Sequence, residues 1–94
     1  MNLEHISGQN KQHHTLVYTL STCGWCRKTK DLLQSLDVDF YYVDVDKLHG
    51  ADSEQIRTEV KRYNSLGTYP TIVIDHGKKV IVGFKEEEIK KVFT

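Results

Sequence analysis

Apolar residues alternate along the chain between strand-like and helix-like spacing. Short runs rich in β-branched and aromatic residues predict strands over Thr15–Leu20, Asp39–Asp46, Thr71–Asp75 and Lys79–Val82. Apolar positions three and four residues apart predict amphipathic helices over Gly24–Leu36, Asp52–Gly67 and Lys85–Phe93. The resulting order is βαβαββα, an α/β fold with a four-stranded mixed sheet flanked by three helices.

The segments between these elements indicate how the elements connect. The first strand–helix–strand unit predicts a right-handed parallel crossover. The turn at His76-Gly77-Lys78 has the spacing and residue types of a tight hairpin, so the last two strands are expected to pair antiparallel. Asp52, with Gln55 three residues later, resembles a capping box that starts the second helix.

Residues 1–14 show no sustained period of either kind. They are polar and predict a mobile N-terminal tail ahead of a domain over residues 15–94. His13 and His14 offer two metal-binding side chains, but two adjacent histidines fall short of a site, and the tail interpretation is favoured.

Length and composition narrow the classes of function. A chain of 94 residues suits one domain, and its 13 basic and 13 acidic residues balance. No net charge therefore selects nucleic acid or an anionic membrane. The chain has no apolar run of roughly 20 residues and no signal-peptide block over residues 1–12. We expect a cytoplasmic monomer that binds neither nucleic acid nor a membrane.

Cys23 and Cys26 carry the clearest chemistry, where the first strand gives way to a helix. The unpaired N–H groups and positive dipole end of that helix favour the thiolate of Cys23, and thiolates rather than thiols attack disulfides. Cys26, one helical turn along, is placed to attack the resulting mixed disulfide. The pair therefore predicts thiol–disulfide exchange, in which Cys23 attacks, Cys26 resolves, and the solvated Arg27 and Lys28 play minor electrostatic roles.

Two other interpretations of the cysteine pair are less favoured. Structural zinc takes four ligands, and the chain has no further cysteine to complete such a set. The second alternative is a pair of inert thiols, but a C-x-x-C between a strand and a helix is typical of a redox motif. No metal site is predicted within one chain.

Three signatures resemble those of the glutaredoxins and glutaredoxin-like small redoxins, a branch of the thioredoxin superfamily. They are V-Y-T-L-S-T-C-G-W-C at Val17–Cys26, G-T-Y-P-T at Gly67–Thr71 and V-G-F at Val82–Phe84. The resemblance spans Thr15 to Phe93 and implies a thioredoxin fold.

The resemblance also implies a substrate-binding groove beside Cys23. In that family the proline before the third strand is cis and the peptide ahead of it pairs with the substrate backbone, which assigns these roles to Pro70 and Tyr69. Each groove residue has a purely structural alternative, such as a core filler at Phe84 or a turn residue at Gly83. The implied substrate-binding residues are Trp25, Thr68, Tyr69, Pro70, Gly83 and Phe84.

Three positions depart from the glutathione-using members of that family. Gly24-Trp25 replaces their Pro-Tyr, Leu20 replaces a basic residue, and Gly83-Phe84 replaces a Gly-Gly pair. The Gly-Phe form is similar to small redoxins that donate electrons to ribonucleotide reductase and are recharged by a flavin or iron–sulfur reductase. The implied reductant is therefore either glutathione or a reductase of the thioredoxin-reductase-like or ferredoxin-linked class.

The cysteine pair and the groove residues are compatible with three functions. The leading hypothesis is an enzyme without a bound cofactor that reduces disulfides of protein substrates, serving redox homeostasis and electron donation to reductases. The alternative is a binding module, because some family members with glycine after the first cysteine hold a [2Fe–2S] cluster in a dimer, here through Cys23. The third is an inert adaptor that binds partners through Trp25, Tyr69 and Phe84.

Overall fold

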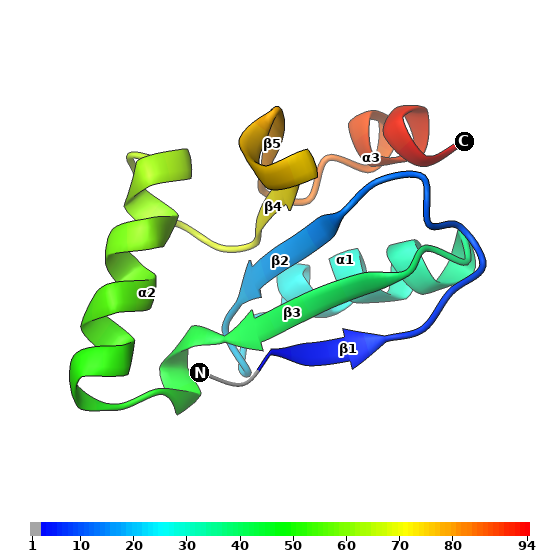
Figure 1. Cartoon of the computed structure of the whole chain (residues 1–94). Helices are drawn as coiled ribbons and strands as arrows, with labels where there is room; N and C mark the ends of the chain where they lie inside the picture. Colours follow the sequence, from blue (N-terminus) through cyan, green and yellow to red (C-terminus); the bar gives the residue numbers. More distant parts are fainter. Residues whose placement is uncertain (1–2) are drawn as a thin grey trace.

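The computed structural model describes residues 3–94 and contains a five-stranded mixed sheet covered by helices on both faces (Figure 1). The strands are β1 (Glu4–Ile6), β2 (Thr15–Thr19), β3 (Phe40–Asp44), β4 (Thr71–Ile74) and β5 (Lys79–Val82). The helices are α1 (Gly24–Ser35), α2 (Gly50–Tyr63) and α3 (Glu86–Phe93). Short 3-10 turns at Val45–Lys47 and Asp75–Gly77 follow β3 and β4. From β2 onward the predicted βαβαββα order is confirmed.

The sheet has the strand order β1-β3-β2-β4-β5. β2 and β3 are parallel and are joined through α1, as the predicted crossover requires. β4 pairs antiparallel with both β2 and β5, so the predicted hairpin is also confirmed. The loop after β2, which ends at Cys23, therefore leaves the carboxyl end of a central strand.

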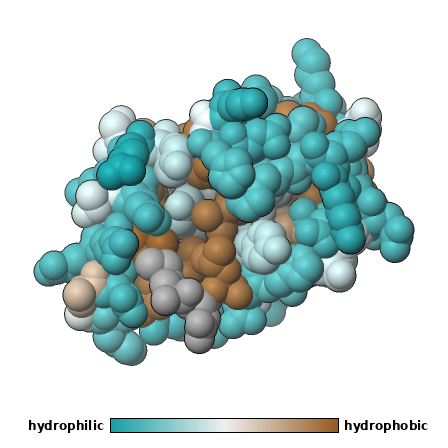
Figure 2. Space-filling model, viewed as in Figure 1, coloured by the Kyte–Doolittle hydropathy of each residue, from teal (hydrophilic) through white to brown (hydrophobic). Residues whose placement is uncertain are grey.

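Alternate residues of the central strands supply two separate hydrophobic cores. Val17 and Ile72 pack with Leu33 of α1 and Phe93 of α3 on one face. On the other face, neighbouring strand residues such as Tyr18 and Val73 pack against α2. Figure 2 shows one side of the molecule as mostly hydrophilic, with a hydrophobic patch exposed near its centre.

The fifth strand comes from the segment that the sequence analysis assigned to a mobile tail. β1 pairs antiparallel with β3, from Glu4 opposite Tyr42 to Ile6 opposite Phe40. The expectation of a four-stranded sheet is therefore wrong by one edge strand, and residues 4–6 of the predicted tail form that strand. A three-residue edge strand with one inward side chain produces no readable period, which explains the error.

Polar contacts and one close glycine approach hold the rest of this N-terminal segment. The amide of Gly8 donates to the Asp39 carboxylate at 3.1 Å, and a Cβ on Gly8 would lie only 2.5 Å from the carbonyl oxygen of Asp37. Asn10 Nδ2 donates to the carbonyl of Phe93 at 2.9 Å. His13 Nδ1 lies 2.7 Å from Asp75 Oδ2. These contacts fix the segment across the ends of β3, β4 and α3.

Two helix boundaries differ from the prediction. α2 begins at Gly50 with no side-chain cap, so Asp52 lies in the first turn rather than in a capping box. An acidic residue there still suits the helix dipole. α2 ends at Tyr63, well before Gly67, because Asn64 leaves helical geometry and turns its side chain toward the next loop.

None of the helices within residues 3–94 combines the length and the apolar character needed to cross a membrane.

Candidate active site

The cysteine pair lies where a tethered turn joins β2 to α1: Cys23 ends the turn, and Cys26 is in the first turn of α1. The amide of Cys23 donates to the carbonyl of Leu20 at 3.1 Å and closes the turn. Both the amide (2.8 Å) and the hydroxyl of Ser21 donate to the Asp46 carboxylate beyond β3. Cys23 has extended geometry and is the N-cap of α1. Its sulfur therefore lies at the positive end of the helix dipole, as predicted.

The two sulfur-bearing residues differ in exposure. Both are free thiols, with Cys23 partly exposed and Cys26 only 1% exposed. The amide of Cys26 donates to Cys23 Sγ at 3.2 Å, which places the second cysteine directly behind the first. Cys23 is therefore partly open to solvent, whereas Cys26 is shielded from it.

Burial raises the pKa of the Cys26 thiol to about 12. The hydrogen bond with Cys23 acts in the same direction, while a backbone hydrogen bond from Leu20 and the charge of Lys30 lower the pKa. Cys26 is therefore a thiol at neutral pH in the reduced protein, which fits a group that reacts second.

Five of the six predicted substrate-binding residues line one shallow groove of about 270 Å³: Trp25, Tyr69, Pro70, Gly83 and Phe84. The rings of Trp25 and Phe84 stack at 5.8 Å, and Trp25 is 58% exposed. The Tyr69–Pro70 bond is cis. Gly83 has a φ of 84°, a geometry that favours glycine, and its amide donates to the carbonyl of Pro70 at 2.8 Å.

Thr68, the sixth predicted residue, lies outside the lining of this groove and belongs to a hydrogen-bond network. Nδ2 of the buried Asn64 lies 3.1 Å from the Thr68 carbonyl and 3.0 Å from its hydroxyl. The same amide reaches Thr71 Oγ1 at 3.1 Å, and Thr71 Oγ1 donates to the Thr68 carbonyl at 2.8 Å. Asn64, which the sequence analysis missed, thus anchors the loop that leads to Pro70. A polar residue at the end of an amphipathic helix was the available signal.

A second cavity of about 280 Å³ lies along α1 and includes Cys23. We call this cavity the trough. Its walls are α1 on one side and residues of β1, β3 and the active-site turn on the other. The lining residues are Ile6, Leu20, Ser21, Cys23, Arg27, Lys30, Asp31, Gln34 and Tyr42. Unlike the groove, the trough has charged walls.

Comparison with known proteins decides the family. The Glutaredoxin family model matches residues 15–80. The chain belongs to the glutaredoxin family. An uncharacterized glutaredoxin-like 8.6 kDa protein in the rubredoxin operon of Clostridium pasteurianum is 38% identical over 76 residues, which cover 81% of this chain and 92% of the relative.

Solved structures of glutaredoxins share this architecture. The crystal structure of the glutaredoxin from Methanosarcina mazei Go1 has a TM-score of 0.87 and 45% identity, covering 99% of this chain and 88% of its own. Methanosarcina acetivorans methanoredoxin has a TM-score of 0.79 and 39% identity, covering 89% and 96%. The predicted thioredoxin fold is confirmed. Membership of the family, together with the closeness of Cys23 and Cys26 in space, supports a thiol redox role for this domain.

Metal binding has no support from the geometry of a single chain. Within residues 3–94, no three histidine, cysteine or acidic side chains gather where a metal ion would sit. The [2Fe–2S] alternative needs a second chain and stays a prediction.

Proposed function

We propose that this glutaredoxin is a thiol–disulfide oxidoreductase that reduces protein disulfides by dithiol exchange. One observation carries the proposal: a partly exposed Cys23 at the start of α1 has the buried Cys26 directly behind it, 3.2 Å from amide to sulfur. This arrangement suits one sulfur for attack and the other for resolution.

The chemistry runs in two balanced steps. The Cys23 thiolate attacks one sulfur of the substrate disulfide, the substrate S–S bond breaks, and the leaving thiolate takes up a proton. Cys26 then loses its proton and attacks Cys23, so the mixed S–S bond breaks and the second substrate thiolate leaves. The substrate gains two electrons, and the enzyme ends with a Cys23–Cys26 disulfide.

The groove supports a protein segment as substrate. Its aromatic walls, Trp25, Tyr69 and Phe84, offer apolar contact area on a surface open to solvent. The peptide between Thr68 and Pro70 pairs with the substrate backbone in this proposal, in line with the family resemblance. A disulfide flanked by apolar side chains would therefore place its sulfur beside Cys23.

The electron donor is part of the proposal. The enzyme disulfide is reduced again in the cytoplasm by a thioredoxin-reductase-like or ferredoxin-linked reductase, or by glutathione. Leu20 packs in the apolar core beneath α2 and Phe84 stacks on Trp25, so two positions that meet glutathione in other members carry apolar residues here. These substitutions favour a protein reductase over glutathione.

Insulin reduction by the purified protein tests the proposal. We expect turnover with at least one of three donors: thioredoxin reductase, a ferredoxin-linked reductase, or glutathione with its own reductase. Cys23→Ser should abolish turnover, whereas Cys26→Ser should trap a mixed disulfide on Cys23 that mass spectrometry detects. Full activity in Cys23→Ser would refute the mechanism, and no activity even with dithiothreitol would refute the enzyme assignment.

A further inference from the structure

The second step of exchange requires a negative charge on a buried sulfur. Cys26 has to become a thiolate to attack the mixed disulfide, yet its side chain is almost fully buried. Burial disfavours a thiolate in the same way as it disfavours any charge. A fixed positive charge close to Cys26 would oppose this effect.

Lys30 carries such a charge on the same helix. It follows Cys26 by four residues on α1, so the two side chains lie on one face of the helix. Its side chain is only 21% exposed and lines the trough that also contains Cys23. The Lys30 ammonium is held in place, 3.8 Å from the centre of the Tyr42 ring and 3.6 Å from Asp44 Oδ1. Two attractive contacts thus tether the Lys30 ammonium between α1 and β3.

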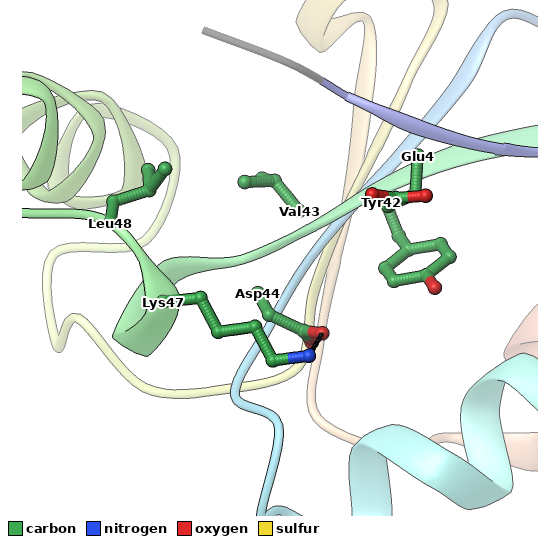
Figure 3. Close-up of a pocket in the computed structure, with 6 residues that line it drawn as sticks. All are labelled: Glu4, Tyr42, Val43, Asp44, Lys47 and Leu48. Carbon is green, nitrogen blue, oxygen red and sulfur yellow. Dashed lines mark ion pairs between the residues drawn. The ribbon is translucent and has the colours of Figure 1, made fainter.

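Asp44 offsets only part of this charge, because its carboxylate is shared with other partners. Its Oδ1 accepts a hydrogen bond from Thr19 Oγ1 at 2.6 Å, and its Oδ2 lies 3.7 Å from Nζ of Lys47. Figure 3 shows the Asp44–Lys47 ion pair at the end of β3, with Tyr42 two residues earlier on the strand. The three charges of Lys30, Asp44 and Lys47 sum to one positive charge, and Lys30 is the member that lies on α1.

We propose that Lys30 is a positioning residue for the resolving step: held by Asp44 and Tyr42, its ammonium group stabilises the thiolate of Cys26 that attacks the mixed disulfide. The inference rests on the proposed function and adds to it a residue that the sequence motif does not contain. It concerns the second sulfur, whereas the helix dipole acts mainly on the first.

Other charged groups near the cysteine pair do not take this role. Arg27 and Asp31 line the trough with opposite charges on an exposed stretch of α1. Lys28 lies over the Trp25 ring at 4.7 Å, on the groove side. Asp46 accepts hydrogen bonds from Ser21. Among these groups, the side-chain charge that lowers the pKa of Cys26 is that of Lys30.

The two steps can be timed separately with 4,4′-dithiodipyridine, an uncharged disulfide, at less than one equivalent per chain. Attack by Cys23 releases the first thiopyridone, and attack by Cys26 on the mixed disulfide releases the second. Lys30→Met should slow the second release about three- to tenfold and shift its pH profile upward, because a nearby opposite charge favours the thiolate. The first release should change less. Lys30→Arg keeps the charge and should restore most of the rate of the second release.

Controls separate charge from structure. Lys91→Met removes an equal charge from an exposed position on α3 and should leave both releases unchanged. Lys30→Gln replaces Lys30→Met if the latter does not fold. Equal second-release rates in wild type and Lys30→Met, or no rescue by Lys30→Arg, would overturn the inference alone. A wild-type protein that never makes the second release would overturn the proposed function itself.

Discussion

The groove and the trough lie beside the same active-site turn and differ in almost every physical respect. The first turn of α1, the loop before β4 and the loop after β5 build the groove, which is aromatic and open. One face of α1 against β1 and β3 builds the trough, which has charged walls and includes Cys23 itself. The groove offers contact area to a substrate, whereas the trough holds fixed charges near the sulfurs.

This difference indicates that recognition and charge control are separate in this protein. Apolar contacts act only where a substrate touches them, so their strength follows the area they bury. Charges act over several ångströms through a partly buried medium and need no contact with the substrate. Substitutions in the groove should therefore change substrate affinity, and substitutions in the trough should change thiol reactivity.

Replacing Asn64, which anchors the loop beside the groove, should have the largest effect on stability and on substrate binding. Asn64→Ala leaves the Thr68 and Thr71 groups without their amide partner, which should lower the free energy of unfolding by about 2 kcal/mol. The KM for insulin should rise, while iodoacetamide should alkylate Cys23 at the wild-type rate. Urea unfolding and alkylation kinetics measure the two effects. Ser65→Ala, at an exposed neighbouring position, is the matched control, and an equal loss of stability in both variants would contradict the prediction.

Truncating the groove wall should have a smaller effect, confined to recognition. Trp25→Ala should raise the KM for insulin about tenfold, because a large aromatic contact is lost. Stability should change little, since Trp25 is 58% exposed. Leu66→Ala removes an even more exposed apolar side chain outside the groove lining and serves as the control. An unchanged KM in Trp25→Ala would show that substrates do not use this wall.

The smallest expected effect is on the pH dependence of stability and concerns Asp46, which binds Ser21 in the wall of the trough. Hydrogen bonds from the Ser21 hydroxyl and amide hold the pKa of Asp46 below its ordinary value. Such a carboxylate stabilises the fold above its unfolded pKa, near pH 4, and loses this contribution as the pH falls through the lower folded value. Asp46→Ala should therefore be less stable than wild type at neutral pH, and the difference should shrink in acid.

Urea unfolding of both proteins at several pH values measures this difference. Asp39 and Asp75 also have lowered pKa values, through hydrogen bonds from His5 and His13, and both stay present in the variant. The comparison thus isolates Asp46. A difference in unfolding free energy that is the same in acid as at neutral pH would contradict the assignment.

Local sequence patterns were enough to predict most of the helices and strands. The apolar spacing of α1, the β-branched runs of β2 and β4, and the turn residues at His76–Lys78 each favour one local structure, so the order from β2 to α3 followed from them. The position of the cysteine pair at the start of α1 followed for the same reason, because a strand–turn–helix junction can be read from adjacent residues.

Contacts between residues distant in the chain could be identified only in the folded molecule. β1 forms because β3 provides an edge for pairing and Asp39 accepts a hydrogen bond from Gly8. The three residues of β1 themselves give no sign of either partner. Asn64 and Lys30 appear in the sequence as ordinary polar residues of helices. The loop before Pro70 gives Asn64 its role, and β3 gives Lys30 its role, because hydrogen bonds and charges act between neighbours in space rather than along the chain.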